Sequence, residues 1–263
     1  MVKMNDYLAV CERAARAGGQ VLLDWVGRFA AREKGPSDLV TEADLASQEI
    51  IRGILQTSFP QHGFIGEEGG SKGPADAEYC WYVDPLDGTT NYVHQIPHYC
   101  VSIALARGEE LLCGTVFDPI SQECFTAKQQ GGAFLNGARI RVSDVKEIQS
   151  AVAAASFPPR LKPDSRELKE LSRVMVAAQA VRRTGSAALN LCYLAAGRFD
   201  AYWGGVTHPW DIAAGVLMIL EAGGTVSNSD GGKMQMDGGR IVAAATHALH
   251  EQILKLVGDN SAC

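Results

Sequence analysis

Residues 81–94 read WYVDPLDGTTNYVH, in which strand-forming residues are followed by two aspartates, a proline and a glycine. Because proline has no N–H donor, a strand that reaches Asp84 and Pro85 cannot continue its hydrogen-bond ladder, and we predict a turn there. In such a turn the carboxylates of Asp84 and Asp87 can face one point beyond the strand end. The amides of Gly88 and Thr89 can then point at an anion.

Two carboxylates held at one point repel each other and any phosphate, unless a divalent cation lies between them. Mg²⁺ prefers oxygen ligands and commonly takes one or two carboxylates, waters and phosphate oxygens. Other acids can serve the same site: Glu67 and Glu68 in the glycine-bounded segment IGEEGG, and Asp211 after HPW. Each feature alone is also typical of a turn, a solvated loop or a helix start, so only their combination indicates a metal site.

The composition restricts the partners and the compartment that we expect. The 263 residues have a formal net charge of -6 and scattered basic residues, which argues against a nucleic acid or an anionic membrane as the main partner. We find neither a signal-peptide pattern nor an apolar run of the roughly 20 residues that cross a bilayer. The cysteines form no C-x-x-C pair, which predicts buried thiols in a cytoplasmic protein.

The hydrophobic patterns predict a mixed α/β (α+β) architecture of layered helices and sheets. Residues 8–25 have helical periodicity, and a second helix is expected between a cap at Thr41 and Pro60. A β-rich stretch follows and ends in a hairpin at Asn136–Gly137, after which strands and helices alternate. We interpret residues 1–263 as one domain of two tightly packed subdomains, with a boundary near residues 145–150.

Several motifs occur in a fixed order along the chain: DLVTEAD, GEE, WYVDPLDGTTNYVH and PWDIAAG. In these motifs the chain resembles the inositol monophosphatase family of Mg²⁺-dependent, lithium-sensitive phosphatases, and the resemblance extends from the opening helix to the final one. It implies a layered αβαβα sandwich of the inositol monophosphatase / fructose-1,6-bisphosphatase type. It also implies a homodimer.

The resemblance implies a ligand set for two or three Mg²⁺ ions in each active site. Glu67, Asp84 and the backbone carbonyl of Leu86 would hold the first ion, and Asp84, Asp87 and Asp211 the second. Glu68 and Lys34 would lie just behind these ligands.

The same resemblance assigns the remaining roles in catalysis and binding. Thr89, with Asp44 behind it, would orient the attacking water that Glu67 and the metal activate. Phosphate would meet Asp87, Asp211 and the amides of Gly88 and Thr89. Ser186 and Ala187 would line the pocket for the rest of the substrate.

The implied reaction is the hydrolysis of a small phosphate monoester, inositol monophosphate first, by a metal-activated water without a phosphoenzyme. The alternatives are a sugar bisphosphatase, a histidinol-phosphate phosphatase, a nucleotide 3'-phosphatase, or a regulatory relative associated with RNA or transcription. One position departs from the family pattern: Gly204 stands where a glutamate usually binds substrate hydroxyls. The identity of the substrate therefore stays open.

Overall fold

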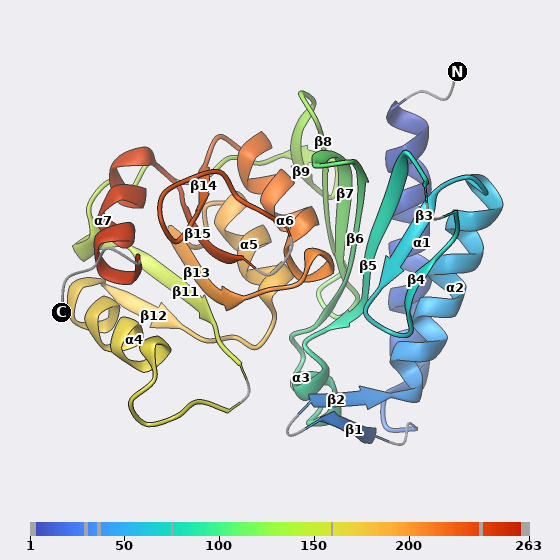
Figure 1. Cartoon of the computed structure of the whole chain (residues 1–263), viewed down its shortest axis with the longest axis horizontal. Helices are drawn as coiled ribbons and strands as arrows, with labels where there is room; N and C mark the ends of the chain where they lie inside the picture. Colours follow the sequence, from blue (N-terminus) through green and yellow to red (C-terminus); the bar gives the residue numbers. More distant parts are fainter. Residues whose placement is uncertain are drawn as a thin grey trace.

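The computed structural model describes residues 4–28, 31–35, 38–74, 76–158, 160–236 and 239–258. Helices and sheets alternate in five layers, as Figure 1 shows, with an eight-stranded sheet in one half and a five-stranded sheet in the other. The predicted αβαβα sandwich is therefore confirmed.

The first half has two long helices on the outer face of the eight-stranded sheet. This sheet has the strand order β10-β9-β8-β7-β6-β5-β3-β4, and β3 alone pairs in parallel with its neighbour β5. Its strands are β3 (Gly63–Gly66), β4 (Gly70–Lys72), β5 (Tyr79–Asp87), β6 (Cys100–Arg107), β7 (Glu110–Asp118), β8 (Glu123–Lys128), β9 (Gly132–Leu135) and β10 (Ala138–Arg139). The remaining elements of this half are α1 (Met4–Trp25), β1 (Ala31–Gly35), β2 (Asp38–Thr41), α2 (Glu42–Ser58) and α3 (Thr89–Val93).

The second half has helices on both faces of its sheet, which has the order β12-β11-β13-β15-β14. The strands are β11 (Val152–Ser156), β12 (Ala180–Arg182), β13 (Ala201–Val206), β14 (Thr225–Asn228) and β15 (Arg240–Ala244). Helices α5 (Ala187–Ala195) and α6 (Pro209–Glu221) form the central layer, while α4 (Arg166–Ala177) and α7 (His247–Val257) form the outer one (Figure 1). A 3-10 turn, Ile148–Ser150, precedes β11.

Both sheets are buried on two faces. Successive side chains of a strand point to opposite faces, and the apolar side chains on each face pack against a helical layer. On β6, Val101 and Ile103 belong to the core under α1 and α2, whereas Ala104 belongs to the core around α5 and α6. On β13, Tyr202 faces the central helices and Trp203 faces the outer ones. The central core thus joins the two halves, and the subdivision near residues 145–150 stays a prediction.

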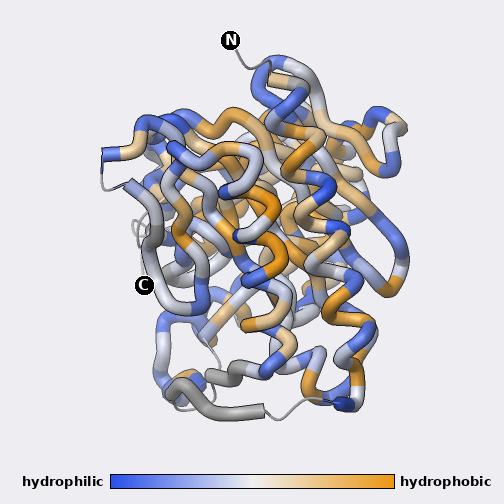
Figure 2. Tube along the Cα trace, turned by 90° about the vertical axis from the view of Figure 1, so that its right-hand side faces the viewer, coloured by the Kyte–Doolittle hydropathy of each residue, from blue (hydrophilic) through white to orange (hydrophobic). Residues whose placement is uncertain are grey.

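Hydropathy along the chain follows these layers. Figure 2 shows hydrophobic stretches in the interior of the molecule and hydrophilic residues along outer turns. The cysteines of the described residues are free thiols, and all except Cys80 are buried, as the sequence predicted.

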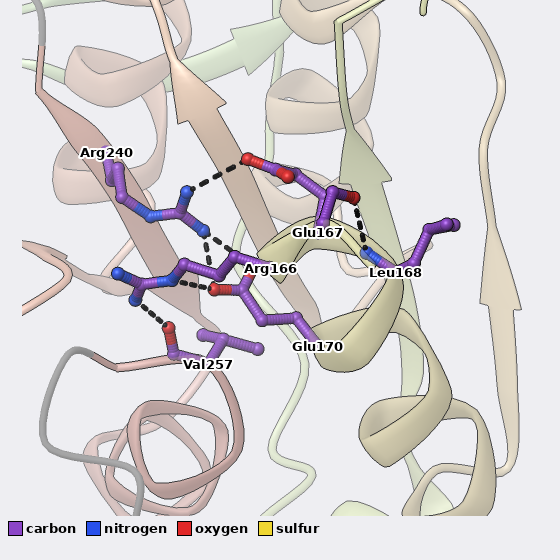
Figure 3. A network of polar contacts seen from close by, with 7 residues as sticks. Arg166, Glu167, Leu168, Glu170, Arg240 and Val257 are labelled. Atoms are coloured by element: carbon purple, nitrogen blue, oxygen red, sulfur yellow. Dashed lines mark hydrogen bonds and ion pairs between the residues drawn. The ribbon is translucent and has the colours of Figure 1, made fainter. Parts of the chain in front are cut away.

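The outer layer is fixed by a buried acid at the centre of a polar network (Figure 3). Glu170 on α4 is fully buried, and its carboxylate accepts hydrogen bonds from Arg166 at 2.5 Å and from Arg240 at 2.6 Å. Arg166 also donates to the backbone oxygen of Val257 at 2.9 Å. Two cations with good geometry compensate the burial of this carboxylate. The network joins α4 to β15 and to the end of α7.

The predicted end of a strand at Asp84 is wrong. Strand β5 continues through Pro85 to Asp87, and its pairing with β6 shifts register between Asp84 and Asp87. Such an irregularity accommodates a residue without an N–H donor. The carbonyl of Pro85 accepts a hydrogen bond from the Ser47 hydroxyl of α2 at 3.1 Å. The two aspartates therefore flank an irregular strand segment and not a simple turn.

Candidate active site

Asp84 lies at the irregular segment of β5 and is almost completely buried. One of its carboxylate oxygens accepts a hydrogen bond from the amide of Leu86 at 2.9 Å. The partner of Asp84 across the sheet is Ser102, whose hydroxyl donates to the backbone oxygen of Trp210 at 3.1 Å. The sheet thus places Asp84 next to the first turn of α6, which carries Asp211.

Asp87 is held from the opposite half of the chain. Its Oδ2 accepts hydrogen bonds from the Ser186 hydroxyl at 2.6 Å and from the amide of Ala188 at 2.7 Å. Ser186 is the N-cap of α5 and also accepts from the amide of Leu189 at 3.1 Å. A carboxylate at a helix N-terminus is stabilised by the unsatisfied amides and by the helix dipole. The expected site residues Ser186 and Ala187 therefore adjoin Asp87.

Gly88 follows Asp87 and has a backbone conformation that favours glycine. Its φ is +99°, and a Cβ there would lie 3.1 Å from the backbone oxygen of His98. Gly88 is the N-cap of the short helix α3, which begins at Thr89. The Thr89 hydroxyl donates to the backbone oxygen of Leu86 at 3.1 Å. The two residues expected to receive phosphate thus lie directly beside the acidic segment.

Asp211 is the third residue of α6, where an acid is favourable in the first turn. Its Oδ2 accepts a hydrogen bond from the amide of His208 at 2.9 Å, which completes the backbone side of a capping box. Pro209 begins the helix, and the rings of His208 and Trp210 stack at a centroid distance of 4.6 Å. The segment HPWD thus fixes Asp211 in a defined orientation.

Glu67 and Glu68 lie in the turn between β3 and β4. The amide of Glu67 donates to the backbone oxygen of Val83 at 3.1 Å, which places this turn beside β5. The backbone of Glu68 is held by the side chain of Gln48, which accepts from its amide at 3.0 Å.

The acidic side chains lie within electrostatic reach of one another, as their pKa values show. Burial, followed by the charges of Glu67, Asp87 and Asp211, raises the pKa of Asp84 well above its usual value. Burial also raises the pKa of Asp87 to about 6, against the lowering effect of its hydrogen bonds with Ser186 and the α5 amides. It raises the pKa of Asp211 to about 7. Clustered carboxylates in a buried place are typical of functional sites.

The donor set fits a hard divalent cation. In the described residues, Asp84, Asp87 and Asp211 make no ion pair with a lysine, arginine or histidine. A cation would compensate their mutual repulsion, and carboxylate oxygens are the ligands that Mg²⁺ prefers. Across the described ranges, however, no three His, Cys, Asp or Glu side chains stand together as a ready metal site.

Two expected site residues are less closely joined to this cluster. Asp44 is fully buried in α2, and its Oδ2 caps the helix by accepting from the amide of Thr41 at 2.9 Å. Burial raises the pKa of Asp44 to about 7, with smaller contributions from the charges of Glu67 and Glu68. Asp44 and Thr89 make no hydrogen bond with each other in the described structure, and Asp44 Oδ1 has no partner there. Lys34 lies in β1, but its side chain is outside the described residues.

Sequence reasoning missed three polar residues that support the site. They are Ser47 behind Pro85, Ser102 behind Trp210, and Cys100, whose Sγ lies 3.9 Å from Asp87 Oδ2. The available signal was a single polar residue inside an otherwise apolar strand or helix face, as in CVSIALA.

Other features of the surface do not coincide with the acidic cluster. A hollow of about 330 Å³ is lined by Ser229, Asp230, Glu251, Leu254, Lys255 and Gly258, and one of about 540 Å³ opens beside Glu12 and Arg16. Neither is lined by Asp84, Asp87 or Asp211. Within the described ranges, no helix combines the length and the apolar character that a membrane crossing needs.

The fold and the acidic cluster together define a phosphatase of the layered α/β class. More particularly, the model of the inositol monophosphatase family matches residues 3–262, and the chain belongs to this family.

Known relatives carry two kinds of name. The Nus factor SuhB of Vibrio cholerae is 43% identical over 263 residues, which cover 98% of this chain and 97% of that protein. An inositol-1-monophosphatase of Rhizobium meliloti is 44% identical over 224 residues, which cover 84% of each chain.

Solved structures agree with this assignment. The inositol monophosphatase of Anabaena (Nostoc) sp. PCC 7120 superposes with a TM-score of 0.88 at 36% identity over 100% of both chains. An IMPase/NADP phosphatase complexed with Mg²⁺ and phosphate superposes with a TM-score of 0.82 at 25% identity, covering 92% of this chain and 91% of that one.

Proposed function

We propose that the protein hydrolyses small phosphate monoesters in the presence of Mg²⁺, with inositol monophosphate as the first candidate substrate. The single observation that carries this proposal is the cluster of Asp84, Asp87 and Asp211, in which burial raises the pKa of each carboxylate and the charges of neighbouring acids raise it further. Family membership supports the same reaction class.

The residues present would hold Mg²⁺ in two groups, with Asp84 shared between them. One group comprises Glu67, Asp84 and the carbonyl of Leu86, and the other comprises Asp84, Asp87 and Asp211. Bound Mg²⁺ supplies Lewis acidity, which makes a water a better nucleophile and neutralises charge on the phosphate and the leaving oxygen.

The chain's own groups bind and orient the reactants. The backbone amides of Gly88 and Thr89 lie at the start of α3 and would receive phosphate oxygens. The Thr89 hydroxyl, held by the Leu86 carbonyl, would orient the attacking water, and the buried Asp44 would accept a proton behind it. Ser186 and Ala187 would contact the alcohol part of the ester. Because the phosphoryl transition state is loose, positioning and charge compensation account for most of the catalysis.

A second candidate function is the one that the name of the Vibrio relative carries, a Nus factor. It is favoured by the 43% identity over nearly the whole of both chains. The acidic cluster and the net charge of -6 favour the phosphatase instead, because a nucleic-acid surface needs clustered basic residues. We further propose that the protein is a cytoplasmic homodimer that needs no nucleic acid for its activity.

The experiment that tests the proposal is an assay of phosphate release from a panel of monoesters. The panel contains inositol 1-phosphate, glycerol 2-phosphate, fructose 1,6-bisphosphate, histidinol phosphate and a nucleotide 3'-phosphate, each with Mg²⁺ and with EDTA. We expect Mg²⁺-dependent release from at least the first two. If no ester is hydrolysed at saturating Mg²⁺, the phosphatase proposal is wrong and the second candidate function gains support.

A further inference from the structure

Strand β5 contains one residue more than its neighbour β6 across the acidic segment. Asp84 pairs with Ser102 in β6. Asp87, three residues further along β5, pairs with Cys100, which is only two residues away from Ser102. Two residues of one strand then oppose one residue of the other, which is the arrangement of a β-bulge. In a regular strand the side chains of Asp84 and Asp87 would point to opposite faces, whereas the extra residue puts them on the same face.

The face that carries these two acids packs on the central helices. In β6, Cys100 and Ala104 belong to the core around α5 and α6. Ser102 alternates with them and therefore shares their face. Residues directly opposite each other in an antiparallel pair also share a face, so each aspartate has a polar residue of β6 beside it. Both of these residues, Cys100 and Ser102, are almost completely buried.

Ser102 connects the strand position of Asp84 to the start of α6. Its hydroxyl donates to the backbone oxygen of Trp210 at 3.1 Å. Trp210 directly precedes Asp211 in the first turn of that helix. One hydroxyl of β6 therefore holds the residue before Asp211 against the cross-strand neighbour of Asp84.

Cys100 makes the corresponding connection between Asp87 and the start of α5. Its Sγ lies 3.7 Å from the Ser186 hydroxyl oxygen and 3.9 Å from Asp87 Oδ2. The single proton of the Ser186 hydroxyl is donated to Asp87, so the thiol is the donor in both contacts. The thiol thus adds a donor to the pair that Ser186 and Asp87 form at the N-terminus of α5.

We propose that Cys100 and Ser102 are positioning residues of the acidic site, which hold the acids of β5 in place against the starts of α5 and α6. A cation bound by Asp84, Asp87 and Asp211 needs these carboxylates at a fixed spacing, although they come from the two halves of the chain. Metal ligands depend on such supporting contacts for their orientation. The inference rests on the proposed function, because it concerns the same cation site.

Ser102→Ala tests the contact with α6. Calorimetric titration should give a Mg²⁺ dissociation constant raised by about ten-fold or more, as is typical when a residue that supports a metal ligand is lost. Ser102→Cys keeps a weaker donor at the same place and should have an affinity between those of the wild type and Ser102→Ala. A serine that only stabilises the fold would lower the Tm and leave the Mg²⁺ dissociation constant unchanged.

Cys100→Ala tests the contact with α5. Because a thiol is a weak donor, the Mg²⁺ dissociation constant should rise by only about three-fold. Cys100→Ser removes a similar volume from the core but keeps a donor. Its affinity for Mg²⁺ should therefore stay closer to that of the wild type than the affinity of Cys100→Ala does.

Ser227→Ala is the matched control for Ser102→Ala. Ser227 is also a buried serine of a strand, but it lies in β14 of the other sheet. Its hydroxyl donates to the backbone oxygen of Asn228 at 2.7 Å and lies 2.9 Å from His250 Nε2. This variant should lose stability and keep the Mg²⁺ dissociation constant of the wild type.

The outcomes separate this inference from the proposed function. If the wild type binds Mg²⁺ and the variants at positions 100 and 102 bind it equally well, the positioning role is overturned and the phosphatase proposal stays intact. An equal loss of Mg²⁺ affinity in Ser227→Ala would also overturn the role, because general loosening of the fold would then explain the effect. Wild type that binds no Mg²⁺ would overturn the proposed function and this inference with it.

Discussion

The hydroxyl of Ser186 donates a 2.6 Å hydrogen bond to the carboxylate of Asp87, although the two residues are 99 positions apart in the sequence. Asp87 ends a strand of the eight-stranded sheet, and Ser186 caps a helix of the central layer. One contact thus joins the acidic segment to the second half of the chain. The acidic cluster depends on how the halves pack against each other.

Replacing Ser186 by alanine removes this hydrogen bond together with the cap of α5. We expect a loss of about 1 kcal/mol or more in the free energy of unfolding, because both an N-cap and a hydrogen bond to a charged group are lost. Mg²⁺-dependent turnover should also fall, since Asp87 loses its orientation. Thermal unfolding and phosphate release measure the two effects.

Ser165→Ala is the matched control for Ser186→Ala. Ser165 caps α4 by accepting from the amide of Leu168 and has no contact with the cluster. This variant should lose similar stability from its cap and keep the Mg²⁺ dependence of the wild type. Equal losses of turnover in both variants would show that the contact with Asp87 has no special role.

The stability of the metal-free protein should fall as the pH rises from about 4 to about 7. The pKa values of Asp44 and Asp211 are raised to about 7, and that of Asp87 to about 6. In this range the folded state keeps protons that the unfolded chain has released, so the free energy of unfolding decreases with pH.

Mg²⁺ should reverse this trend, because it competes with protons for the same oxygens. The increase in Tm on adding Mg²⁺ should therefore be larger at pH 7.5 than at pH 5.5. Thermal shift measurements at both pH values test this, with KCl at matched ionic strength as the control. A larger increase at pH 5.5 would contradict the assignment of these carboxylates as ligands.

The sequence predicted the elements whose signals are local. Thr41 forms the expected capping box with Asp44, and Asn136–Gly137 forms the expected hairpin turn. The short strands β12 and β14 were missed, because three or four residues carry too little periodicity to identify a strand. The local rule for Pro85 failed, since the sheet tolerates the missing donor at an irregular position.

The candidate site was predicted mainly from the order of its motifs. Spacing could not show that Ser186 would meet Asp87, because that contact depends on the packing of two sheets around one helical layer.

Lithium should inhibit the enzyme at millimolar concentration, as the resemblance to the lithium-sensitive family implies. Li⁺ would compete for one of the Mg²⁺ positions. The LiCl concentration that halves the rate of phosphate release should therefore change when the Mg²⁺ concentration is raised. A titration of phosphate release with LiCl, beside KCl at equal ionic strength, measures this effect. Identical curves for the two salts would mean that the geometry of the cation site differs from that of the family.

Gly204 should shift the substrate preference away from inositol monophosphate. A glutamate at this position would accept charge-assisted hydrogen bonds, so its absence should cost inositol 1-phosphate about ten-fold to a hundred-fold in kcat/KM. The kcat/KM for glycerol 2-phosphate should be reduced only slightly. Gly204→Glu should therefore raise the ratio of kcat/KM for inositol 1-phosphate over glycerol 2-phosphate.

Gly204→Gln is the control for this substitution, because glutamine has nearly the size of glutamate and lacks its charge. The glutamine should improve the ratio less than the glutamate does. If both variants leave the ratio of the wild type unchanged, another residue determines the preference.

The central claim is that the carboxylates of the cluster hold the Mg²⁺ on which hydrolysis depends. The most direct measurement is phosphate release by Asp84→Asn and Asp211→Asn, titrated with Mg²⁺ to saturation and compared with Asp118→Asn. Asp118 is as buried as Asp84 and also binds backbone amides, but lies outside the cluster. The account predicts that the first two variants lose turnover by orders of magnitude while Asp118→Asn keeps the Mg²⁺ dependence of the wild type. Folded Asp84→Asn or Asp211→Asn protein with most of the wild-type turnover at saturating Mg²⁺ would contradict it.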